Sequence, residues 1–161
     1  MGAIHSTWTR PWPDFWAEMQ MNWKLIAQLT LLGLAMELGS VFFIPTMVEP
    51  IVWLTLYVAY AYSIGKHCRL WRFWHGLILG VLNGIWITGT HEVFRARFLE
   101  RHPEELALID VYRSHGFGWS PRHIMAINGA ASGLFWGVVV GVFAVVAGLM
   151  MKPRQVQLPA D

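Results

Sequence analysis

The sequence predicts an all-α membrane protein, a bundle of four transmembrane helices with an interfacial amphipathic helix in the loop between spans three and four. Three observations lead to this fold class. The 161 residues are 55% hydrophobic and 14% charged, which is too apolar for an ordinary soluble domain. Apolar runs of about 18 residues or more, long enough to cross a bilayer, recur along the chain. Within two of these runs, glycine returns at every fourth position.

The glycine repeats predict which helices pack together. One set consists of Gly129, Gly133, Gly137 and Gly141, and the other of Gly76, Gly80 and Gly84. Four-residue spacing places each set along one face of a helix. Glycine lets a second backbone approach closely, so that van der Waals packing and weak Cα–H contacts replace the hydrophobic drive that lipid does not supply. We therefore expect the third and fourth spans to pack through these glycines.

The first elements are an N-terminal segment and a helical hairpin. Residues 1–23 are rich in tryptophan, which favours the headgroup region, and they lack the design of a secretory signal, so a retained interfacial segment is expected. The first span covers residues 24–44, and Pro45 ends it. The second span covers residues 47–64. So short a connection makes the two spans antiparallel.

The remaining elements follow a short basic connection. The third span covers residues 73–93. In the polar segment after it, residues 103–105 (Pro-Glu-Glu) form a first helical turn with acids at the positive end of the helix dipole, so a short amphipathic helix is expected there. The fourth span covers residues 123–151 and a polar tail covers residues 152–161. Residues 24–151 are thus expected to form one transmembrane domain.

The placement of basic residues predicts the orientation. Four spans put both termini on one side of the membrane, and Lys and Arg favour the cytoplasmic side. Seven basic residues lie on the side of the termini, namely Arg10, Lys24, Lys66, Arg69, Arg72, Lys152 and Arg154, against Arg95, Arg97, Arg101, Arg113 and Arg122 on the other. We therefore predict a protein integral to the bacterial cytoplasmic (inner) membrane, with both termini in the cytoplasm.

One acid, Glu37, falls inside the first span. A carboxyl group in the hydrocarbon region is costly and is a functional candidate by default. At about 1.5 Å per residue, Thr88, Thr90 and Asn128 reach a similar height in the outer third of the membrane, so one hydrogen-bonded layer is expected. Three roles are open to Glu37: a neutral carboxyl group that holds the helices in register, a proton or ligand site, and a contact with a partner subunit.

A second polar group falls at the outer rim of the predicted bundle. It consists of Glu49, His91, Glu92 and His123. Their spacing matches no metal-binding motif, and the single cysteine cannot form a Cys-x-x-Cys site, so interfacial hydrogen bonds are expected and no metal. The chain also carries no catalytic motif, so we assign no catalytic residue and expect no enzyme.

No cofactor is predicted. A haem held by two histidines of one chain needs them at matched depth, whereas His75 and His91 are sixteen residues, or about 24 Å, apart. A haem held by one histidine, a quinone or a pigment resting on the many aromatic side chains stays open.

The order of the parts carries a resemblance. A hairpin of two spans is followed by Tyr62 and Gly65 ahead of the third span, by residues 103–105 in the polar segment, and by a glycine-rich fourth span that ends in basic residues. This layout, from Lys24 to Lys152, resembles that of small four-helix bacterial inner-membrane proteins filed as domains of unknown function. The resemblance brings no catalytic residues.

These observations lead to three hypotheses on function. The first is an accessory, assembly or structural subunit that sits among membrane lipids and packs against other membrane subunits or against itself. An alternative is a small proton- or ligand-handling membrane protein that uses Glu37. A further alternative is a subunit that contacts a haem, quinone or pigment. Because the charged residues are dispersed, no nucleic-acid partner is expected.

Overall fold

The computed structural model describes residues 21–115 and 119–151, and every regular element in these ranges is an α-helix. The helices are α2 (Trp23–Phe42), α3 (Glu49–His67), α4 (Arg72–Val93), α5 (Arg95–Arg101), α6 (Pro103–Ser114) and α7 (Pro121–Met150). The predicted all-α class is thus confirmed for the described residues. Residues 1–20 of the predicted N-terminal segment and residues 152–161 of the predicted tail lie outside them.

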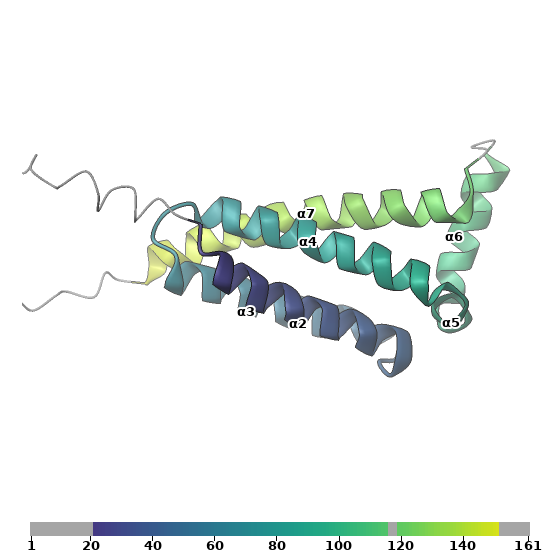
Figure 1. Ribbon diagram of the computed structural model, residues 1–161, viewed down its shortest axis with the longest axis horizontal. Coiled ribbons are helices and arrows are strands. Elements are labelled where there is room, and N and C mark those ends of the chain that lie inside the picture. Colours follow the sequence, from purple (N-terminus) through teal and green to yellow (C-terminus); the bar gives the residue numbers. More distant parts are fainter. Residues whose placement is uncertain (1–20, 116–118, 152–161) are drawn as a thin grey trace, which may run out of the picture.

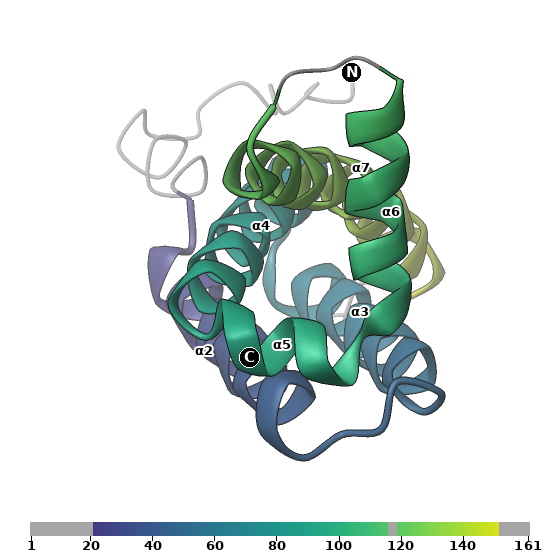
Figure 2. The ribbon, with the colours of Figure 1, turned by 90° about the vertical axis from the view of Figure 1, so that its right-hand side faces the viewer.

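The four long helices lie side by side and alternate in direction (Figure 1). The most extensive contact is between α4 and α7, while α3 packs on α7 and α2 packs on α4. The short helices α5 and α6 lie across one end of the bundle (Figure 2). The opposite end holds the start of α2 and the end of α7 (Figure 1).

Two helices, α2 and α7, are long and apolar enough to cross a membrane. Helix α4 meets this criterion only together with α5, from which a bend of 95° separates it. Helix α3 falls short of it, and its 19 residues include charged or polar side chains at both ends and three tyrosines between them. Length and composition therefore give two spans, or three if the bent pair is counted as one, and they indicate membrane association.

The helix ends follow from local chemistry. The side chain of Asn22 accepts a hydrogen bond of 3.1 Å from the backbone N–H three residues on, which caps the start of α2. Ser120 caps α7 in the same way, and Pro121 takes the first helical position, where no N–H is needed. Between α3 and α4 the chain turns at Trp71, which has a left-handed φ of 59°.

Helices α4 and α7 meet backbone to backbone. A Cβ atom added at Gly80 would lie 2.2 Å from Cα of Gly137, and one added at Gly76 would lie 2.5 Å from Cα of Gly141. The same holds along the whole contact: at each of Gly76, Gly80, Gly84, Gly129, Gly133, Gly137 and Gly141, the nearest atoms belong to the other helix. A residue larger than glycine at these positions would require a neighbour to shift, and the site described below lies beside this contact.

Apolar packing fixes α5 and α6 on the end of the bundle. Phe98 of α5 and Ile109 of α6 are buried against Val41, Ile124 and Met125. Helix α6 covers the segment where the sequence predicts an amphipathic helix, whereas α5 was not predicted. The other large apolar side chains of α6 are exposed, namely Leu106, Leu108 and Val111.

Candidate functional site

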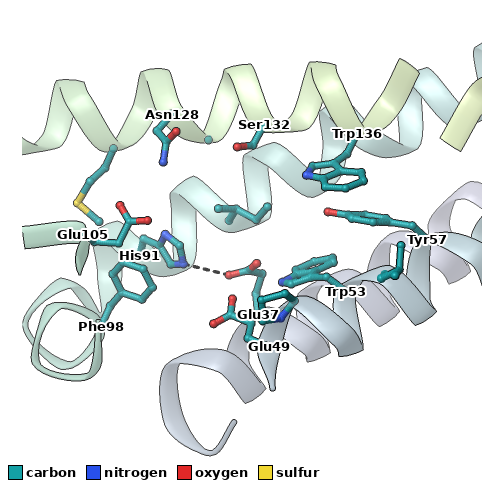
Figure 3. A pocket seen from close by; sticks show the side chains of 15 residues that line it. Glu37, Glu49, Trp53, Tyr57, His91, Phe98, Glu105, Asn128, Ser132 and Trp136 are labelled. Atoms are coloured by element: carbon teal, nitrogen blue, oxygen red, sulfur yellow. Dashed lines mark ion pairs between the residues drawn. The ribbon is translucent and has the colours of Figure 1, made fainter. Parts of the chain in front are cut away.

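A cavity of about 430 Å³ lies inside the bundle at the end that α5 and α6 cover (Figure 3). All six helices contribute to its walls. The polar lining consists of Glu37, Glu49, Tyr57, His91, Glu105, Asn128 and Ser132, and the aromatic lining of Trp53, Phe98 and Trp136. The exposed residues among the lining, Pro50 and Leu54 of α3 and Asn128 of α7, place its mouth between the first halves of these two helices.

Glu37 of α2 is only 2% exposed and points into the cavity (Figure 3). Its Oε2 lies 3.1 Å from Nε2 of His91, which is an ion-pair distance. The two groups are not aligned for a hydrogen bond, and neither atom has a hydrogen-bond partner among the described residues. A buried carboxylate oxygen without a donor is costly. Oε2 of Glu37 therefore faces the cavity without a hydrogen-bond donor among the described residues.

A second histidine and carboxylate pair lies beside the first. Nε2 of His102 is 3.0 Å from Oε2 of Glu49, and Nδ1 of His102 is 3.0 Å from the carbonyl oxygen of Phe98. A carbonyl oxygen only accepts, so Nδ1 must carry a proton and donate it. For Nε2 and Oε2 to form a hydrogen bond, one of these two atoms must also carry a proton. His102 and Glu49 thus share one proton between Nε2 and Oε2.

Phe98 joins the two pairs. Its ring stacks on the ring of His91 with centroids 3.6 Å apart and on that of His102 with centroids 4.3 Å apart, both at 21° between planes. The order is therefore carboxylate, histidine, phenyl ring, histidine, carboxylate. Phe98 lies in α5 and His102 directly follows that helix, which places the two residues one helical turn apart. This i, i+4 spacing is the signal that could have revealed their partnership in the sequence.

Three stacked aromatic rings form another part of the cavity wall. Tyr57 lies between Trp53, at 5.2 Å between centroids and 25° between planes, and Trp136, at 4.5 Å and 21°. Because both faces of its ring are covered, Tyr57 presents its hydroxyl end to the cavity (Figure 3). The cavity thus has a polar side, at Glu37 and His91, and an aromatic side.

The predicted layer of Glu37, Thr88, Thr90 and Asn128 does not form as expected. Glu37 and Asn128 line the same cavity, but the hydroxyl groups of the two threonines donate to carbonyl oxygens of their own helix, at 2.9 Å and 2.8 Å. A threonine in a helix makes this bond without ordering a distant partner. The group that faces the Glu37 carboxylate is instead His91.

The predicted outer-rim group also separates into different contacts. Glu49 pairs with His102 and His91 pairs with Glu37, as described above. Glu92 pairs with Arg122, with Nε 3.3 Å from Oε2, and Nδ1 of His123 lies 2.9 Å from the Ser120 hydroxyl oxygen. Within residues 21–115 and 119–151, no three His, Cys, Asp or Glu side chains gather in a way that could hold a metal ion.

Two further polar contacts tie α2 to α4. Nε1 of Trp86 donates to the hydroxyl oxygen of Thr30 at 3.0 Å, and the Thr30 hydroxyl donates to Oδ1 of Asn83 at 3.3 Å. At the other end of α4, Nδ1 of His75 donates to the carbonyl oxygen of Trp71 at 2.8 Å, and Nε2 accepts from the backbone N–H of Asn22 at 2.9 Å. Both nitrogens of His75 are thus occupied, which leaves none for an iron.

The fold and the cavity together define a helical protein with two or three candidate membrane spans and an internal site of carboxylates, histidines and aromatic rings. Comparison of the chain with protein-family models, with curated proteins and with solved structures finds no match. The functional argument therefore depends on the geometry of the cavity.

Proposed function

We propose that the protein is a four-span membrane protein that binds a small molecule in the cavity around Glu37. The observation that carries this proposal is Oε2 of Glu37, which is buried, faces a cavity of about 430 Å³ and lacks a hydrogen-bond donor among the described residues. Cavities that hold small ligands are about 300–1,000 Å³ in volume and combine apolar walls with a few placed polar groups. An intramembrane carboxylate in such a cavity is suited to recognising a ligand.

The proposal of four spans is supported by the lengths of α3 and α4. These helices have 19 and 22 residues, or about 28 Å and 33 Å at 1.5 Å per residue, which matches a hydrocarbon core of about 30 Å. Both lie alongside the two strongly apolar helices, α2 and α7 (Figure 1). Several of the polar groups that lower the hydropathy of α3 and α4, namely Tyr57, Tyr60, His75 and Asn83, are buried in the bundle and avoid lipid.

The excess of Lys and Arg on the side of the termini supports a cytoplasmic location for both termini in the bacterial inner membrane. The end of the bundle with α5 and α6 then faces outward. The exposed leucines of α6, Leu106 and Leu108, suit a helix that lies in the headgroup region. A ligand would reach the mouth between α3 and α7 from the outer half of the membrane.

The hypothesis of an accessory subunit stays a prediction. It assigns the exposed apolar side chains of the long helices to partner proteins. Lipid requires the same side chains on any membrane helix, so these surfaces do not favour a partner over lipid.

The test is to identify small molecules that remain with the protein after native purification in a mild detergent. A Ser132→Phe variant fills the cavity, and Ala126→Phe is the matched control because Ala126 is exposed on the same helix, α7, and lines no cavity described here. We expect mass spectrometry to detect a bound molecule with the wild type and with Ala126→Phe, and to detect much less of it with Ser132→Phe. No bound molecule, or equal amounts with all three proteins, would contradict the proposal.

A further inference from the structure

The carboxylates of the cavity outnumber the basic groups around them. Glu37, Glu49 and Glu105 line it, and His91 is the one basic side chain among the described lining residues, with no Lys or Arg. Glu49 is balanced by His102 through the shared proton. Even with both histidines protonated, one negative charge is therefore left over in the site.

Four arginines at this end of the bundle are engaged elsewhere. Arg95 and Arg122 pair with Glu92, Arg97 pairs with Glu100, and Arg101 donates to the carbonyl oxygen of Phe42. None of these four lines the cavity. Glu105, by contrast, lines the cavity and forms no ion pair within the described part of the chain. The excess negative charge thus faces the cavity itself.

The kind of cation follows from the donors and the shape. A hard metal ion needs about six or more oxygen ligands close together, and the described residues contain no group of three ligands that could hold one. Oε2 of Glu37 needs an N–H or O–H donor, which a quaternary ammonium group lacks. The stack of Trp53, Tyr57 and Trp136 supplies an apolar surface in the same cavity as the acids.

We propose that the ligand of this cavity is a protonated primary or secondary amine that carries an aromatic or branched apolar group. The ammonium group donates to Oε2 of Glu37, and the apolar group lies against Trp53 and Trp136. The mouth beside Leu54 of α3 admits such a molecule with its apolar part on the lipid side. This inference rests on the proposed function, because it names the class of molecule that the same cavity takes.

Three labelled probes of one shape test the inference: 2-phenylethylamine, which is cationic at pH 7, 2-phenylethanol, which is neutral, and phenylacetate, which is anionic. Binding to the full-length protein in detergent is measured by equilibrium dialysis. We expect the amine to bind at least about tenfold more tightly than the alcohol, because a hydrogen bond to a charged group is stronger than one between neutral groups. The anion should not bind measurably.

Variants assign the preference to the carboxylates. Glu37→Gln should reduce the preference for the amine to about threefold or less and leave binding of the alcohol unchanged. Glu105→Gln should also weaken binding of the amine. This variant replaces Glu37→Gln in the test if Glu37→Gln fails to fold, since Glu105 forms no ion pair within the described residues. Glu100→Gln is the matched control, because this acid lies on α5 outside the cavity and its side chain is 67% exposed.

The outcomes separate this inference from the proposed function. Equal affinity for amine and alcohol, abolished by Ser132→Phe, would overturn the amine class and leave the cavity as a binding site. Amine binding that Ser132→Phe does not change would place the probe outside the cavity and also overturn the inference. If no probe binds while native purification recovers a bound molecule, the inference fails alone. If neither experiment finds a ligand, both proposals fail.

Discussion

A single methyl group at Gly80 tests whether the bundle depends on the backbone contact between α4 and α7. The Cβ atom that the substitution Gly80→Ala adds would lie 2.2 Å from Cα of Gly137 and 2.6 Å from the carbonyl oxygen of Gly133. Both neighbours are backbone atoms, which cannot rotate away as a side chain can. Ordinary contact begins at 3.4 Å, so the helices must separate by about 1.2 Å at this point.

The expected cost follows from this separation. Overpacking a well-packed site costs about 1–3 kcal/mol in the free energy of unfolding. Separation also weakens the neighbouring glycine contacts, and lipid offers no hydrophobic drive that would restore them. For a chain of this length, the loss corresponds to a fall of about 3–10 °C in the midpoint of thermal unfolding.

Gly89→Ala is the matched control, because Gly89 lies on the same helix and nothing lies within 4 Å of its added Cβ atom. Both variants gain the same helix propensity, about 1 kcal/mol for Gly to Ala. Unfolding in a mild detergent can be followed by a fluorogenic maleimide, since Cys68 is the single cysteine of the chain and only 5% exposed. If Gly80→Ala unfolds at the same temperature as Gly89→Ala, the contact between α4 and α7 does not hold the bundle together.

Three more predictions can also be checked by labelling Cys68. In the folded protein the Cys68 thiol should resist iodoacetamide at pH 8. Burial raises its pKa by more than the nearby charge of Arg72 lowers it, and only the thiolate reacts. Complete labelling before unfolding would contradict this prediction. His102→Ala leaves the Glu49 carboxylate without its partner and should cost about 1–3 kcal/mol, of which Glu49→Gln in the double variant recovers a part; strictly additive losses would argue against a direct pair. Asn22→Ala removes the cap of α2 and should cost about 1 kcal/mol, whereas Asn22→Ser keeps an acceptor and should cost less, and equal losses would show that the cap does not matter.

The long helices could be predicted from the sequence because one local property, the length of each apolar run, determines them. The bounds of α2, α3, α4 and α7 differ from the predicted 24–44, 47–64, 73–93 and 123–151 by three residues or fewer at each end. Helix α5 could not be predicted in this way. Its seven residues include three arginines, and it is held by the burial of Phe98 between two histidines, which is a tertiary contact.

The sequence could predict the height of each site residue along its helix, but not the direction in which its side chain points. Counting residues along the spans places Glu37 and Thr88 at a similar height, since each residue rises by about 1.5 Å. Which way a side chain points depends on its angle around the helix, and that angle depends on how the helices pack. Thr88 faces α7, where an added Cβ atom on Gly129 would meet its hydroxyl group, while His91 faces Glu37. An acid inside a span thus indicated the site, but its partner required the packing.

The sizes of the side chains along α3 and α7 explain why the cavity lies at this end of the bundle. Near the termini, α3 and α7 touch through small residues: a Cβ atom added at Gly65 would lie 2.9 Å from Cβ of Ala147. Toward α5 and α6, the stacked rings of Trp53, Tyr57 and Trp136 stand between the same two helices, and the long helices diverge in this direction (Figure 1). Rigid rings hold the helices apart but do not fill all the space that they create, whereas the small residues at the other end let the two helices touch. The aromatic stack therefore has two roles, as the spacer that opens the cavity and as its apolar wall.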